Sequence, residues 1–250
     1  MEWMKRTLCL LTGLLLIGSA IAEETAEKST EDTSTEAREI IRKVDEAIKA
    51  VNGVRYRAIS QPTGLATNFV TGGEGTAILI GWTGSNPQMF YADVTSEKDG
   101  AKRRLTGGGD GDTYFIVDHE NKKAYEDMDP AVMGSIGSAV QALGMTEFVH
   151  DAPFDDELKA EKLELLGVEK VAGVDCFKIH VDYGPGQQST WFFSTEDYLP
   201  RKRIRHFQMP QGDGSLEQLV MDLEIDPTVD PSLFKLKLPE GYELIDDFAP

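Results

Sequence analysis

The chain has 250 residues, 43 acidic and 25 lysine or arginine, and its formal net charge is −18 at pH 7. A surface this acidic repels a phosphate backbone, which excludes nucleic acid as an expected partner. The length suffices for one domain with a substantial hydrophobic core.

The first 22 residues have the features of a secretory signal peptide. Lys5 and Arg6 precede an apolar run at positions 8–17, and positions 20–22 read Ala-Ile-Ala, a pattern typical of a cleavage site. The apolar run is shorter than the roughly 20 residues that a membrane span needs. We therefore expect a periplasmic or secreted protein that is cleaved after Ala22 and does not span the membrane.

Residues 23–35 are acidic, rich in serine and threonine, and without aromatic or large aliphatic side chains, so we expect a disordered leader. Thr35 is a suitable cap for the helix that follows, and Asn52-Gly53 ends it. Apolar residues recur in this helix at spacings of three and four, which gives one stripe that needs an apolar surface to cover. The stripe consists of Ile40, Ile41, Val44, Ile48 and Val51.

From residue 54 onward the pattern is typical of antiparallel strands joined by tight turns. It is clearest at 174–183, where Phe177 and Ile179 alternate with polar residues. The strand at 201–207 is expected to have a basic exposed face, and 107–111 to be a flexible hairpin tip. Helical patterns interrupt the strands at 130–143 and 156–165. The expected strands are 54–60, 75–82, 89–95, 113–118, 123–126, 174–183, 190–194, 201–207, 216–225, 234–238 and 242–246.

A sheet of about this many strands curls. We therefore predict an α+β fold, a large curled antiparallel sheet (an incomplete β-barrel) whose concave face is covered by the N-terminal helix and the inserted helices. The predicted single domain spans residues 36–250. Such a covered concave face is a natural place for a lipid or ligand cavity.

Patterns for catalysis or metal binding are not found. The sequence has no G-x-S-x-G motif, and the glycine run at 107–111 lacks the lysine of a phosphate loop. Cys176 lies in an expected strand and is interpreted as a small buried residue. We expect no enzyme activity, no cofactor and no metal. The histidines, which lack metal-site spacing, are His119, His150, His180 and His206.

Four segments, in order, resemble the LolA-like superfamily of periplasmic lipoprotein carriers and lipid-binding proteins. They are residues 75–91 with an Asn-Pro turn, 111–125 with an aromatic strand and an Asp turn, 173–201 with Gly-Val-Asp-Cys-Phe and Leu-Pro-Arg, and 230–242 with a closing Phe and Pro-Glu-Gly. The resemblance implies an incomplete barrel lidded by helices around an apolar cavity for acyl chains. The dedicated carriers have a lid-latching arginine before the Pro turn, and residues 82–87 contain none.

Two functions from different classes remain open. The first is a monomeric periplasmic carrier for a lipid, a lipoprotein acyl chain or another amphiphile, with a lipid or acylated protein as its partner. The second is an envelope protein-interaction or sensor domain with a filled core and no transported ligand. For the first, the expected cavity-lining residues are Ile41, Val44, Ile48, Ile78, Ile80, Trp82, Phe90, Phe115, Phe177, Ile179, Trp191 and Met221.

Overall fold

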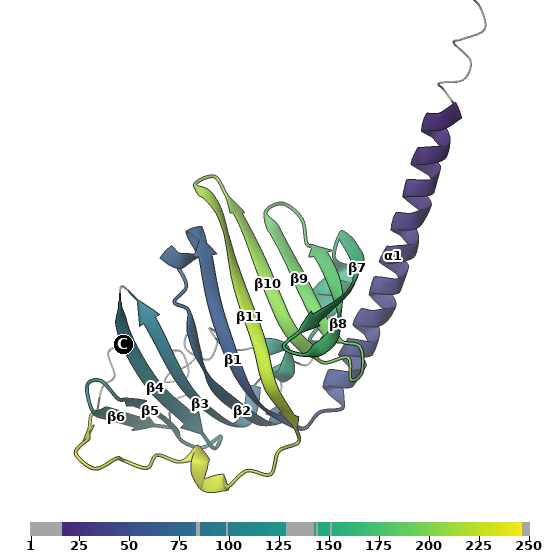
Figure 1. Cartoon of the computed structure of the whole chain (residues 1–250). Helices are drawn as coiled ribbons and strands as arrows, with labels where there is room; N and C mark the ends of the chain where they lie inside the picture. The colour runs from purple at the N-terminus through teal and green to yellow at the C-terminus, as the bar shows by residue number, and fades with distance from the viewer. Residues whose placement is uncertain are drawn as a thin grey trace, which may run out of the picture.

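The computed structural model describes residues 17–83, 86–98, 100–128, 143, 145–150 and 152–246. Within them, a twelve-stranded sheet forms the body of the molecule and bends strongly without closing into a barrel (Figure 1). The strands are β1 (Gly53–Gly64), β2 (Gly73–Thr83), β3 (Asn86–Lys98), β4 (Ala101–Gly109), β5 (Tyr114–Asp118), β6 (Lys123–Asp127), β7 (Lys162–Val171), β8 (Val174–Asp182), β9 (Gln187–Ser194), β10 (Pro200–Met209), β11 (Gly212–Ile225) and β12 (Glu243–Leu244).

The strands lie in the order β12-β6-β5-β4-β3-β2-β1-β11-β10-β9-β8-β7, and only β12 and β6 pair in parallel. Two antiparallel meanders therefore meet where β1 pairs with β11. Because β6 and β7 lie near opposite edges, the chain between them has to cross the sheet. This crossing contains η2 (Thr146–Val149) and α3 (Asp155–Lys159). We use the name crossover segment for the described residues of this connection between positions 143 and 160.

One face of the sheet, called the inner face, carries the main hydrophobic core. Tyr56 of β1, Phe90 of β3 and Ile179 of β8 are buried in this core. Ile41 of α1 and Phe154 of the crossover segment belong to the same cluster. α1 and the crossover segment therefore cover the inner face, and the predicted curled sheet with helical cover is confirmed.

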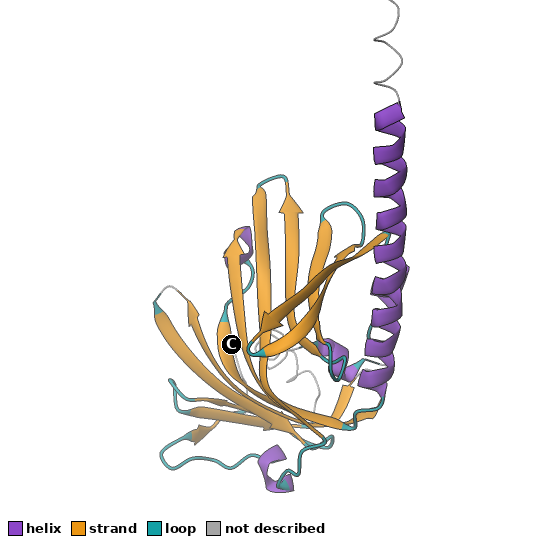
Figure 2. Cartoon of the chain, turned by 45° about the vertical axis from the view of Figure 1, so that its right-hand side comes forward, coloured by secondary structure: helices purple, strands orange, loops and turns teal. Residues whose placement is uncertain are grey.

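The helix α1 (Ile17–Lys49) packs against β7 with its C-terminal part and extends away from the sheet with its N-terminal part (Figures 1 and 2). The predicted apolar stripe, residues 40, 41, 44, 48 and 51, is buried. The helix begins before Thr35, so the segment 23–35, expected to be disordered, is helical here. Neither glycine nor proline interrupts positions 19–49, which allows a helix to propagate through them. The limits of signal peptide, leader and domain stay predictions.

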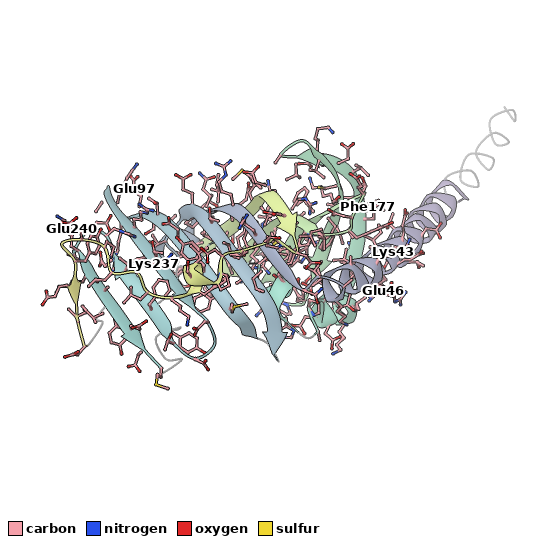
Figure 3. All side chains as sticks on the ribbon, turned by 90° about the horizontal axis from the view of Figure 1, so that it is seen from below. Lys43, Glu46, Glu97, Phe177, Lys237 and Glu240 are labelled. Atoms are coloured by element: carbon pink, nitrogen blue, oxygen red, sulfur yellow. The ribbon has the colours of Figure 1, made fainter. Side chains whose placement is uncertain are left out.

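The opposite face, called the outer face, carries two smaller clusters. Phe115 and Val117 of β5 pack under Leu236 and Tyr242 of the C-terminal segment. This segment contains η3 (Pro231–Phe234), and Figure 3 shows it lying across the strands, marked by Lys237 and Glu240. The second cluster contains Val171, Cys176 and Phe192.

One local prediction is right only in part, and two are wrong. Asp110 and Gly111 lie in the turn between β4 and β5, as expected for a hairpin tip, but the glycines at 107–109 belong to strand β4. A Cβ atom on Gly108 would lie 2.6 Å from the ring of Phe115, so the missing side chain lets an aromatic ring lie against the backbone. The helix expected at 156–165 ends at Lys159, and β7 begins at Lys162. The strand expected at 234–238 is not formed. The helix expected at 130–143 lies outside the described residues, apart from Leu143.

Candidate functional site

A row of polar side chains crosses the middle of the inner face. Ser60 of β1 lies opposite Gln218 of β11, and Gln218 lies opposite Arg203 of β10. Arg203 in turn lies opposite Trp191 of β9. Residues directly opposite on neighbouring strands share a face, so these side chains are contiguous and are called the polar row. The row is buried, with exposed fractions of 3% for Ser60, 0% for Gln218, 6% for Arg203 and 0% for Trp191.

The guanidinium group of Arg203 is bound on several sides. Its Nε and Nη2 donate to Oε1 of Gln218 at 3.0 and 2.7 Å. Its Nη1 donates to Oε1 of Glu147, which belongs to η2 of the crossover segment, at 2.5 Å. Its Cζ lies 4.7 Å from the centre of the Trp191 ring, where a cation–π attraction adds to these bonds. A buried guanidinium needs such partners because removing its charge from water is costly.

Some polar atoms around the row are buried without a hydrogen bond. Oε2 of Glu147, Oγ of Ser60 and Nε of Arg205 have no hydrogen-bond partner among the residues that the structure describes. Each such atom costs roughly 1–3 kcal/mol. A polar ligand that reached these atoms would therefore gain free energy that the protein alone does not.

Arg205 lies next to the polar row on the same face of β10, between Ser189 of β9 and Leu216 of β11. Its Nη2 donates to Oε1 of Gln218 at 3.3 Å, and it makes no ion pair within the described part of the chain. Burial, together with the charge of Arg203, lowers the pKa of Arg205 to about 10. The positive charge of Arg205 is therefore poorly compensated.

A second buried carboxyl group, Glu157 of α3, lies at the Trp191 end of the row. Its Oε1 accepts hydrogen bonds from Nε1 of Trp191 at 3.1 Å and from the hydroxyl of Tyr183 at 2.7 Å. Burial raises the pKa of Glu157, and the charge of Glu147 adds to this effect. The crossover segment thus contacts the polar row through two carboxyl groups.

Aromatic side chains surround the polar row. The ring of Phe154 lies 5.3 Å from that of Trp191 and 5.4 Å from that of Phe193, centre to centre. The rings of Tyr56 and Phe148 lie 5.8 Å apart, centre to centre. All of these rings are fully buried. In this structure the inner face around the row is therefore filled by the protein's own side chains, and we call this arrangement closed.

The predicted lining residues fall on both faces of the sheet. Ile78 lies opposite Arg55 and Tyr91, and Ile80 alternates with the inner-face residue Leu79, so both isoleucines belong to the outer face. Phe115 belongs to an outer cluster and Met221 lies opposite Arg57. The side chain of Trp82 lies outside what the structure describes. The inner-face core contains Ile41, Val44, Ile48, Phe90, Phe177, Ile179 and Trp191, and their role in binding stays a prediction.

The polar row was not predicted from the sequence. The expectation that 201–207 exposes its basic residues is wrong for Arg203, which is buried on the inner face. Ile204 packs on the outer face instead, against the cluster of Cys176 and Phe192. The only signal in the sequence is the Arg-Ile-Arg alternation, which indicates two faces but does not tell which one is the core.

The described residues contain no group of three His, Cys, Asp or Glu side chains placed to hold a metal ion. Burial raises the pKa of the Cys176 thiol to about 11, which disfavours the thiolate that a nucleophile needs. His119 lies between hydroxyl groups, with Nε2 2.7 Å from Oγ1 of Thr106 and Nδ1 3.1 Å from the hydroxyl of Tyr242. The polar row and the rings around it supply buried charge and apolar surface.

Residues 85–246 match the model of a family described as predicted periplasmic protein (DUF2092). The chain belongs to this family. Its description agrees with the expected export from the cytoplasm. Among the described residues, no helix has the length and apolarity for crossing a membrane. No curated protein matches the chain.

Solved structures of similar fold cover most of the chain. Lipoprotein LppX from Mycobacterium tuberculosis is 13% identical, with 78% of this chain and 98% of that chain covered and a TM-score of 0.49. LprF from Mycobacterium bovis is 11% identical, with 84% of this chain and 99% of that chain covered and a TM-score of 0.49. A LolA superfamily protein from Nitrosomonas europaea is 9% identical, with 80% and 97% covered and a TM-score of 0.32. At these identities and TM-scores the similarities carry no argument about a superfamily, a ligand or a role.

Proposed function

We propose that this protein acts in the periplasm, after removal of its signal peptide, as a binding or carrier protein for a lipid, a lipoprotein acyl chain or another amphiphile. The observation that carries the proposal is the inner face itself. It is a broad apolar surface with a polar row at its centre, and segments outside the strand ladder cover it. Such a surface has both components that an amphiphile needs, one for its chain and one for its head.

The attachment of the cover supports this proposal. The strands are joined by continuous backbone pairing, whereas α1 and the crossover segment contact them through side chains. Their polar contacts include the pair Glu147–Arg203 and the bonds of Glu157 to Trp191 and Tyr183. Segments held in this way open at a lower free energy than the sheet. Because the inner face is filled in the closed arrangement, an amphiphile has to displace part of this cover.

An acyl chain supplies the free energy for this displacement. Each buried methylene group contributes about 0.8 kcal/mol, so a chain of ordinary length contributes on the order of 10 kcal/mol. This is comparable to the total stability of a typical domain, and larger than the cost of separating a few side-chain contacts. No catalytic residue is needed for such binding.

A fatty acid with a photoreactive group at the end of its chain tests the proposal. We expect mass spectrometry to find the label on inner-face residues such as Phe90 and Trp191 after irradiation. Phe115 and Met221 are internal controls, because they belong to the same strand ladder but to the outer face. Label confined to the outer face contradicts the proposal. So does protein purified from its own envelope that carries no lipid and takes up none.

The second candidate, an envelope protein-interaction or sensor domain, is favoured by one observation. The inner-face side chains fill the space under the cover, as the complete burial of Val44, Phe154 and Trp191 indicates. If this arrangement never opens, the fold needs no ligand. Labelling that fails, together with a defined envelope protein that co-purifies at a fixed ratio, would favour this function over the first.

A further inference from the structure

We propose that Arg203 and Arg205 form the binding site for the anionic head group of the amphiphile, and that Glu147 occupies this site in the closed arrangement. The inference rests on the proposed function and names the class of head group, an anionic oxygen group such as a carboxylate or a phosphate. Neither the family description nor the similar structures assign such a site.

The charges around the polar row favour an anion. Arg203 and Arg205 extend from the same face of β10, and the N–H groups of both converge on Oε1 of Gln218. Arg203 has one carboxylate partner, Glu147, and Arg205 has none within the described residues. Glu157, the second carboxyl group at the row, bonds to Trp191 and Tyr183 and makes no ion pair with either arginine within the described residues. The two guanidinium groups therefore share one ion-paired carboxylate, that of Glu147. An anion placed between them would be attracted by both.

The unbonded polar atoms fit the same ligand. Nε of Arg205 is a buried donor without a partner in the described chain, and Oγ of Ser60 is a second group able to donate. Ser60 is adjacent to Gln218 in the polar row. A carboxylate or phosphate group accepts several hydrogen bonds at once, so it can accept from Nε of Arg205 while it compensates the charge of that side chain. A neutral sugar or alcohol head group would bond to these donors without compensating the charge of Arg205.

In the closed arrangement the carboxylate of Glu147 takes the place of the ligand's anionic group. The side chain extends from η2, and its Oε1 accepts a hydrogen bond from Arg203. Its Oε2 is buried without a hydrogen bond in the described chain. An incoming anion competes with Glu147 for Arg203. When the anion binds, η2 is released from Arg203. The part of the cover that lies over the polar row is then released together with η2. Binding of the head group and opening of the cover are therefore one event.

The test compares three amphiphiles that share a dodecyl chain, namely dodecanoate, dodecyl phosphate and the neutral dodecyl maltoside, by calorimetry below their micelle concentrations. We expect wild-type protein to bind the anionic compounds about tenfold more tightly or better, since hydrogen bonds to a charged group are stronger than those to a neutral group. The two anionic compounds tell a carboxylate site from a phosphate site. Inorganic phosphate alone serves as the probe without a chain, and we expect it to bind far more weakly than dodecyl phosphate.

Three variants identify the residues. In Arg205→Gln we expect the preference for anionic compounds to be lost while the affinity for dodecyl maltoside is kept. Lys202→Gln is the matched control. It removes the same charge from the same strand, but Lys202 lies on the outer face beside Glu217 and Phe192, so the preference should remain. Glu147→Gln keeps the shape of the side chain and removes the competing charge, so it should strengthen anion binding several-fold.

The outcomes separate the two proposals. Equal affinity for all three amphiphiles overturns the head-group site and leaves the amphiphile-binding function in place. Binding of none of them contradicts the function itself. If Arg205→Gln loses its circular dichroism signal, Glu147→Gln decides. An equal gain for neutral and anionic compounds means that Glu147 acts only as a structural contact, and the inference is then wrong.

Discussion

The guanidinium group of Arg38 lies 2.6 Å from the carbonyl oxygen of Leu158, so α1 binds the C-terminal end of α3. A second bond, to the carbonyl oxygen of Ala160 at 3.3 Å, strengthens this contact. The last carbonyl groups of a helix lack partners within it and carry partial negative charge, which makes a cation a suitable cap. The two parts of the cover are therefore joined to each other as well as to the sheet.

Replacing Arg38 should loosen the cover without unfolding the sheet. We expect Arg38→Gln to lower the free energy of unfolding by about 1–2 kcal/mol, because hydrogen bonds from a charged donor are lost. Arg42→Gln is the control, since Arg42 is exposed on the same helix and its replacement should change stability by less than about 0.5 kcal/mol. Urea unfolding measures both, and equal effects would show that the Arg38 contact does not hold the cover.

The C-terminal segment should stabilise the outer face through Tyr242. Its ring packs against the cluster that contains Phe115, and its hydroxyl lies 3.1 Å from Nδ1 of His119. We expect Tyr242→Ala to cost about 1–3 kcal/mol and Tyr242→Phe only about 1 kcal/mol, since the second change keeps the ring. Leu244→Ala, at a side chain that is 54% exposed, should have little effect. Thermal unfolding measures this order, and a Phe variant as unstable as the Ala variant would contradict it.

The stability of the closed arrangement should depend on the ionisation of Glu157. Burial raises the pKa of this carboxyl group in the folded state, and the repulsion of Glu147 raises it further. The hydrogen bond from Tyr183 and the charge of Arg203 act in the opposite direction and lower the pKa. In the unfolded chain the group loses its proton at its ordinary pKa, about 4.3. As the pH rises above that value, the unfolded state is favoured until the folded group also ionises.

Glu157→Gln removes this dependence and keeps an oxygen that accepts the bonds of Trp191 and Tyr183. We expect the variant to gain stability relative to wild type as the pH rises from 4 toward 7, about 1.4 kcal/mol for each unit by which the pKa is raised. Denaturant unfolding at several pH values measures the difference. A difference that is constant, or that shrinks as the pH rises, would show that Glu157 is not held in its neutral form by burial.

How far the sequence predicts this fold depends on whether one face of an element is clearly polar. The stripe of α1 was predicted because Glu39, Arg42 and Lys43 separate its apolar residues. Strand β2 has apolar side chains on both faces, and the large Ile78 was chosen for the core where the structure places Ala77 and Leu79. Alternation gives the two faces of a strand, and the tertiary contacts decide which of them is the core.

The same ambiguity concealed the candidate site. Arginine is rarely buried, so Arg203 and Arg205 were assigned to solvent. Their burial depends on Glu147 and Gln218, which come from the crossover segment and from β11. No local pattern relates positions so far apart. The glycines of β4 were misread for a similar reason, because the aromatic rings that pack on them belong to neighbouring strands.

A charge placed in the stripe of α1 tests whether the helix is a movable cover. Ile41 is fully buried in the inner-face core, and Ile41→Asp would put an unpaired carboxylate there, at a cost of several kcal/mol. We expect this cost to weaken the docking of the helix, because it offsets much of what the buried stripe contributes. Arg42→Asp is the matched control, which adds the same side chain at the exposed neighbouring position. Hydrogen exchange should accelerate in residues 37–51 and the crossover segment of the first variant, and the sheet should stay protected. Acceleration throughout β8, β9 and β10 would mean that α1 is an integral part of the core, and binding by displacement of the cover would then be excluded.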